Sequence, residues 1–128
     1  MKILVPISVG ELFDKISILE IKTKKIKNKE ALDIIKFELK SLKKIVSQKK
    51  LTKTKIKQKY IMLKKINSKL WNIENKKRSC ENKKNFDSKF IELARKVYIY
   101  NDKRAEIKNK INIISNSKIK EVKSHHKY

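Results

Sequence analysis

Hydrophobic residues recur along the chain at alternating intervals of three and four positions. This spacing places apolar side chains on one face of an α-helix, and polar turns separate the periodic stretches. The pattern predicts four helices, over about residues 9–26, 31–49, 56–82 and 88–115. In the first of these the apolar stripe is unusually wide, which indicates a helix that is buried on more than one side.

Two of the predicted helices also carry start signals. Ser8 and Glu11 have the spacing of a capping box, in which the Ser side chain accepts a bond from a first-turn amide. The Glu side chain of such a box bonds back to the amide of the Ser. Asn85-Phe86-Asp87-Ser88 resembles a hydrophobic staple and a cap at the start of the fourth helix.

Four helices with short loops predict an all-α protein, either an antiparallel helical bundle or a long helical hairpin. The single Gly and the single Pro both precede the first long periodic stretch, so later segments lack the breakers that strand-and-turn proteins use. Residues 3–5 and 119–122 could pair as a very short β-ribbon, although strands of this length are marginal alone. We expect one helical domain over residues 1–116 and a basic tail over residues 117–128.

The net charge of +23 raises the question of nucleic-acid binding, because a basic surface releases counterions from phosphates. Only three of the 36 cationic residues are Arg, while Lys, Ile and Asn make up nearly half of the chain. That skew is typical of an AT-rich genome, which encodes Lys wherever a solvated polar residue is tolerated. We therefore favour solvated helix faces over a nucleic-acid surface as the explanation of the charge.

The sequence indicates neither a metal site nor a bilayer span. Cys80 is the only cysteine, so no disulfide forms within one chain, and a reducing, cytoplasmic setting is expected. His125 and His126 stand together in the polar tail without a third ligand, and we expect them to be solvent-exposed. No apolar run approaches the length of about 20 residues that crosses a bilayer. We expect a soluble protein without metal or cofactor.

The three Arg residues are informative in a chain that uses Lys by default, since a planar guanidinium has five fixed donors. Arg104 falls on the apolar stripe of the fourth helix, where it needs a carboxylate or a bound anion. We expect it to be at least half-buried and bonded to a carboxylate of the first helix or to the neighbourhood of Asp102. Arg78 lies four residues after Glu74, the spacing of an ion pair on a helix.

Two interpretations of the polar residues stay open. They form a salt-bridge layer that fixes the register of the helices, which we favour, or Arg95, Arg104 and Lys15 line a pocket for a phosphate or carboxylate. Aromatic residues among them are expected to be core or interface anchors. The candidate residues for either arrangement are Glu11, Asp14, Lys15, Glu20, Trp71, Glu74, Arg78, Arg95, Tyr98, Asn101, Asp102 and Arg104.

Two motifs carry a resemblance to a known family. They read VPxSxGELxDKxxILEIK over residues 5–22 and ELARxVYxxNDxRA over residues 92–105. Both resemble an uncharacterised proteobacterial family of short helical proteins, a domain of unknown function, and the similarity covers roughly residues 3–112. The resemblance implies no activity. Members sometimes occur beside genes for glycan assembly, which implies a role linked to glycan or cell-envelope synthesis.

Three functions are compatible with these observations. The favoured one is a non-enzymatic helical interaction or accessory protein, with a protein partner or a homodimer, because no catalytic triad or phosphate loop is present. The second is a small helical anion-binding or enzymatic domain. In its favour, Asp14-Lys15 and Ile18-Leu19 resemble the first helix of the chorismate mutase family, although that family has an early Arg where this chain has Lys. The third is non-specific nucleic-acid binding through Lys.

Overall fold

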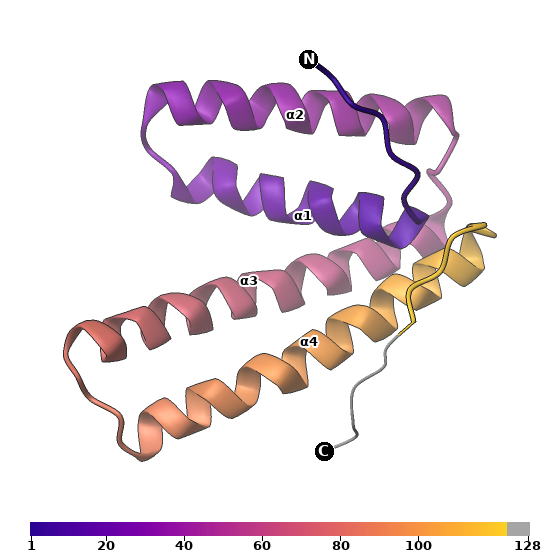
Figure 1. Cartoon of the computed structure of the whole chain (residues 1–128). Coiled ribbons are helices and arrows are strands. Elements are labelled where there is room, and N and C mark those ends of the chain that lie inside the picture. The colour runs from indigo at the N-terminus through magenta and orange to yellow at the C-terminus, as the bar shows by residue number, and fades with distance from the viewer. Residues whose placement is uncertain (123–128) are drawn as a thin grey trace.

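The computed structural model describes residues 1–122 and shows four packed α-helices, with no strand in that range (Figure 1). The helices are α1 (Val9–Lys25), α2 (Lys29–Gln48), α3 (Thr54–Asn82) and α4 (Ser88–Ile114). Every helix end lies close to its predicted position. The all-α prediction is therefore confirmed. His125 and His126 lie outside the described residues.

The helices form two antiparallel hairpins, α1 with α2 and α3 with α4 (Figure 1). α1 is the central element, because it packs against each of the other three helices, whereas α2 packs along α1. α3 has 29 residues and α4 has 27, against 17 in α1. At about 1.5 Å per residue, α3 and α4 outrun α1 and continue beyond it as a two-helix arm. This arm ends in the loop before Ser88 (Figure 1).

The hydrophobic core forms where α1 crosses α3 and α4. Its buried members come from all three helices: Phe13, Ile56, Leu63, Ile107 and Ile111. Each such side chain contributes roughly 1.5–3 kcal/mol when it leaves water. Other apolar residues of α1, such as Leu19 and Ile21, are buried although they do not belong to this cluster. The wide stripe of α1 therefore follows from its three packing partners.

The helix starts agree with the capping signals in part. Ser8 Oγ accepts a hydrogen bond from the Glu11 amide at 3.0 Å, and Asp87 Oδ1 accepts one from the Lys89 amide at 3.0 Å. Both predicted caps are confirmed. The second half of the predicted capping box is absent, because the Glu11 carboxylate bonds instead to Lys108 at 2.7 Å.

Three helices end in a left-handed residue although none of them uses glycine there. Lys50, Lys84 and Asn116 follow α2, α3 and α4 with φ near 55°. After α2, the Leu51 amide bonds to the Val46 carbonyl at 3.0 Å, and the same pattern recurs after α3 and α4. This is a Schellman motif. A lysine in the left-handed region costs about 1–2 kcal/mol. The hydrogen bonds at the ends of α2 and α3 must therefore offset the strain at Lys50 and Lys84.

The β-ribbon suggested for residues 3–5 and 119–122 is not formed, and that prediction is wrong. A hydrogen bond from the Val9 amide to Ser117 Oγ, at 3.1 Å, links the start of α1 to the C-terminal segment. From there the two terminal segments diverge: the N-terminal segment crosses toward α2, and the C-terminal one returns along α4 (Figure 1). Glu121 holds the second segment through Lys108 of α4, at 3.1 Å. Strands this short would gain too few hydrogen bonds to compete.

Replacing a left-handed lysine by glycine should stabilise the protein. We expect Lys84→Gly to raise the free energy of unfolding by about 0.5–1 kcal/mol, because glycine adopts a positive φ without steric strain. Urea unfolding gives the measurement. Lys83→Gly is the matched control, since it removes the same charge one residue earlier, at a φ of −85°. The control should lose about 0.5–1 kcal/mol. Equal stability losses in both variants would contradict this account of the helix end.

Candidate functional site

Asp14 of α1 lies at the crossing of α1 with α3 and α4, and only 1% of it is exposed. Its Oδ1 accepts hydrogen bonds from Asn67 Nδ2 of α3 and from Arg104 Nε of α4, both at 2.9 Å. Its Oδ2 accepts from Arg104 Nη2 at 2.5 Å. The two bonds from Arg104 run in parallel, which is the strongest arrangement of guanidinium and carboxylate. The bonds to Asp14 also raise the pKa of Arg104.

Lys108 lies one turn after Arg104 on α4, with 9% of its side chain exposed, and three carboxylates surround it. Its Nζ donates to Glu11 at 2.7 Å and to Glu121 at 3.1 Å, and it lies 3.9 Å from Asp14 Oδ2. Burial alone would lower the pKa of Lys108. The bond to Glu11, the charge of Asp14 and the bond to Glu121 outweigh it, so the pKa is raised. We call this group the polar layer; its members are Glu11, Asp14, Asn67, Arg104, Lys108 and Glu121.

The start of α1 is fixed to the end of α4 by backbone contacts. The Gly10 amide donates to Asn112 Oδ1 at 2.6 Å, and the Val9 amide donates to Ser117 Oγ. A Cβ on Gly10 would collide with the main-chain carbonyl oxygen of Lys108. Glycine therefore lets α1 approach α4 closely. Asn112 of α4 and Ser117, which follows α4, accept from amides at the start of α1 that have no partner within the helix.

Sequence reasoning missed several of these residues. Ser117 and Glu121 fall within the predicted basic tail, yet they bond to α1 and α4. Lys108 lies one helical turn from Arg104 but is not among the candidate residues predicted from the sequence. A usable signal was that Gly10 is the only glycine and that Glu121 is the only acid after residue 106.

The remaining candidate residues do not gather at one site but lie in different parts of the fold. Glu20 joins three helices: it accepts from the Tyr60 hydroxyl and lies 3.5 Å from Lys64 and 3.9 Å from Lys43. Glu74 pairs with Lys77 at 3.7 Å and not with Arg78, so the expected ion pair of Glu74 and Arg78 is not formed.

The three cations proposed for an anion pocket do not converge. Arg95 is exposed on the two-helix arm, nine residues and about 13 Å along α4 from Arg104. Lys15 is exposed and lies 4.0 Å from Glu11. Instead, Arg104 lines a pocket of about 330 Å³ together with Arg78 and Trp71. The other predicted residues lie along α4, with Tyr98 exposed and Asn101 and Asp102 half-buried.

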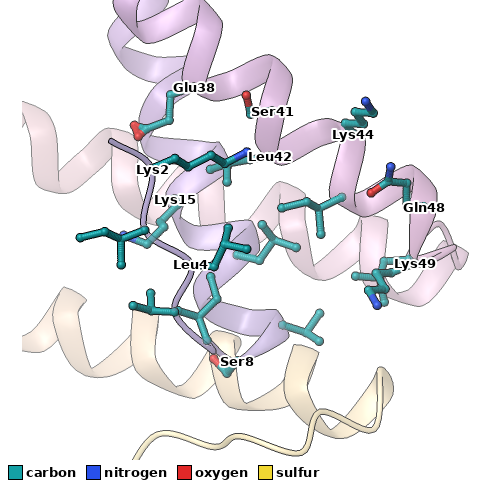
Figure 2. Close-up of a pocket in the computed structure, with 17 residues that line it drawn as sticks. Lys2, Leu4, Ser8, Lys15, Glu38, Ser41, Leu42, Lys44, Gln48 and Lys49 are labelled. Atoms are coloured by element: carbon teal, nitrogen blue, oxygen red, sulfur yellow. The ribbon is translucent and has the colours of Figure 1, made fainter.

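A larger groove of about 970 Å³ lies between residues 2–7, the start of α1 and one face of α2 (Figure 2). We call it the N-terminal groove. Its apolar lining consists of Ile3, Leu4, Val5, Ile7, Val9, Leu12, Leu42, Ile45 and Leu51. Its charged lining consists of Lys2, Lys15, Lys44 and Lys49, with Glu38 as the one carboxylate. The sequence pattern gives no indication of this groove, because residues 2–7 have no helical period.

The polar layer is arranged to hold helices together. Each of its three carboxylates is already bonded to Arg104 or Lys108, so none is left free to act as a general base. Within residues 1–122, no group of three or more His, Cys, Asp or Glu side chains is arranged to hold a metal ion. None of the described helices is long and apolar enough to cross a membrane.

Comparison with known proteins adds family information only. The profile of a family described as a family of unknown function (DUF6165) matches residues 1–127. No curated protein and no solved structure matches the chain.

Removing the guanidinium of the polar layer should be strongly destabilising. We expect Arg104→Ala to lower the free energy of unfolding by about 3 kcal/mol, because Asp14 would stay buried without its counter-charge. Arg104→Lys should recover part of this loss, since an ammonium restores the charge but not the parallel bonds. Lys103→Ala, a neighbouring exposed lysine, should stay within about 0.5 kcal/mol of the unchanged protein. Equal urea midpoints for the three variants would show that Arg104 is only a solvated cation.

The raised pKa of Lys108 predicts a pH dependence. Its ordinary value is 10.5, so its stabilising contribution is complete below that pH and is lost as the pH rises through the higher folded value. We expect the stability difference between the protein and Lys108→Met to stay constant from neutral pH to about pH 10 and to shrink above it. Urea titrations at each pH measure it. A difference that shrinks on acidifying from pH 9 to pH 7 would contradict the assignment.

Proposed function

The chain belongs to the DUF6165 family, whose function is not established, and we propose that it is a non-enzymatic helical interaction protein. We propose further that it binds an acidic, apolar segment of a partner protein in the N-terminal groove. The partner segment is an amphipathic helix, the usual occupant of an apolar groove that runs along a helix.

The observation that carries this proposal is a second apolar face on α2. One face of α2 packs on α1, but Ile34, Phe37 and Ile45 lie on another face, at helical spacing. Ile45 lines the groove, whereas Ile34 and Phe37 lie on α2 before the part that lines it. Ile34 is 71% exposed and Phe37 is 76% exposed. Side chains of this size gain roughly 1.5–3 kcal/mol each when they are covered. Large exposed apolar side chains that share one helix face are typical of a surface that a partner covers.

The N-terminal segment supplies the opposite wall of the groove and is also uncovered. Leu4 is 84% exposed, and Ile3 and Val5 are largely exposed as well. Within residues 1–122 the backbone of residues 1–7 makes no hydrogen bond. A partner helix between this segment and α2 would bury both apolar surfaces at once. Residues 34–48 of α2 span about 21 Å, which matches a partner helix of about 14 residues.

Charge favours an acidic partner over a second copy of this chain. Four lysines line the groove against the single carboxylate of Glu38. Two copies, each with a net charge of +23, would repel each other on approach. An acidic segment would be attracted and would associate faster at low salt.

We place this interaction in the cytoplasm, where Cys80, which is a free thiol, would stay reduced. The family resemblance adds a proposed setting, glycan or cell-envelope synthesis in a bacterium. Proteins of that synthesis are the first partners to search for.

A site-specific cross-link tests the proposal. A photoreactive side chain at Ser41, inside the groove, should cross-link one protein in the native host, and the cross-linked peptide should be rich in Asp and Glu with apolar residues at helical spacing. The same label at Gln58 of α3 should not capture it. Ile45→Glu should reduce the yield at least tenfold, whereas Ile61→Glu, on an exposed part of α3, should leave it unchanged.

Three results would contradict the proposal. One is a cross-link to a second copy of the chain, which would assign the groove to a homodimer. Another is capture that nuclease treatment abolishes, which would assign it to nucleic acid. The third is an equal yield from Ile45→Glu and Ile61→Glu.

A further inference from the structure

A second concave site lies between α1, α3 and α4, apart from the N-terminal groove. It has a volume of about 330 Å³, and its lining includes Asn67, Trp71, Glu74, Arg78 and Arg104. None of these residues lines the groove. The chain has three Arg and one Trp, and two of the Arg and the Trp meet in this one pocket. In a sequence that uses Lys by default, that coincidence indicates a requirement for guanidinium groups.

Arg104 lines this pocket, and its guanidinium is held in place. Its Nε and Nη2 are held by the two oxygens of Asp14. Its Nη1 has no hydrogen-bond partner within residues 1–122, so two N–H donors remain available. Because Asp14 already fixes the plane of the guanidinium, an anion that binds there loses little side-chain entropy.

Arg78 provides a second guanidinium. It is exposed and forms no ion pair with the described residues, because Glu74, one turn earlier, is paired with Lys77. Trp71 is half-buried and offers a ring beside the apolar side chains of Ile18 and Leu70. A planar apolar group would therefore be accommodated next to the two cations.

Asn67 also contributes a hydrogen-bond acceptor to this pocket. The residue is only 5% exposed, and its Nδ2 donates to both Asp14 and Ser17. Its Oδ1 accepts no hydrogen bond from the part of the chain that the structure describes, and it is not sealed off from solvent. A ligand that carries a hydroxyl would donate to this oxygen in place of water.

We propose that this pocket binds a small aromatic carboxylate that carries a hydroxyl group. The carboxylate is held by Arg78 and by Nη1 of Arg104, the ring lies against Trp71, and the hydroxyl donates to Asn67. A carboxylate fits better than a doubly charged phosphate, because Glu74 lines the same pocket and repels the additional charge. The volume is at the small end of ligand pockets, which favours a single ring.

The test uses 4-hydroxybenzoate as the probe, with the full chain. Trp71 is the only tryptophan, so its fluorescence reports on this pocket, and calorimetry gives an independent affinity. We expect a saturable change in fluorescence and the same dissociation constant by both methods. 4-Hydroxybenzamide, which has the same shape without the charge, should bind at least tenfold more weakly, and benzoate, which lacks the hydroxyl, at least threefold more weakly.

Variants separate this pocket from general attraction to a basic surface. Arg78→Ala should weaken the binding of 4-hydroxybenzoate at least tenfold with no change in the urea midpoint, because Arg78 is exposed and unpaired. Lys76→Ala removes the same charge from an exposed residue outside the pocket and should bind normally. The proposal is overturned by the absence of saturable binding, by equal losses in the two variants, by equal affinity for the benzamide or for benzoate, or by tighter binding of phenyl phosphate.

Discussion

The buried carboxylate of Asp14 is the constraint on which the arrangement of the helices depends. Asp14 belongs to α1, and its bonds reach Asn67 on α3 and Arg104 on α4. A carboxylate that is 1% exposed would cost several kcal/mol if either helix moved away and left it without partners. Apolar packing at the core is tolerant of sliding, whereas two parallel hydrogen bonds are not. The ion pair therefore fixes where α1 crosses the α3–α4 hairpin.

Other acidic residues also connect helices, although the chain has a net charge of +23. Only 13 residues are acidic, and four of them, Glu11, Asp14, Glu20 and Glu121, connect different elements of the fold. Acidic side chains are thus used where they hold helices together. α2 packs along α1 and against no other helix, so only one of its faces is covered. The N-terminal groove lies beside the part of α2 that stays uncovered. The fold thereby separates a polar interior, which holds α1, from an apolar surface, which is available to a partner.

The sequence was sufficient for the helices and for the requirement of Arg104 for a carboxylate, but it left the partner open between the first helix and the neighbourhood of Asp102. Apolar periodicity located all four helices, and Arg104 stood out because a guanidinium on an apolar stripe requires a carboxylate. Periodicity reports which face of a helix is buried but not the angle at which two helices cross. It therefore could not show that Arg78 and Arg104 share a pocket or that Arg95 lies apart from them. Residues 2–7 and 117–121 have no helical period of their own. Periodicity therefore gave no information on the groove or on the bonds of Ser117 and Glu121 either.

A double-mutant cycle on Asp14 and Arg104 tests the central claim most directly. Free energies of unfolding would be measured for the unchanged protein, for Asp14→Leu, for Arg104→Leu and for the double variant. If the pair fixes the crossing of α1, each single change leaves a buried charge or its partner unpaired, and the double variant loses at least about 2 kcal/mol less than the sum of the two. Losses that add to within about 0.5 kcal/mol would mean that the two residues act independently, and the account would be wrong.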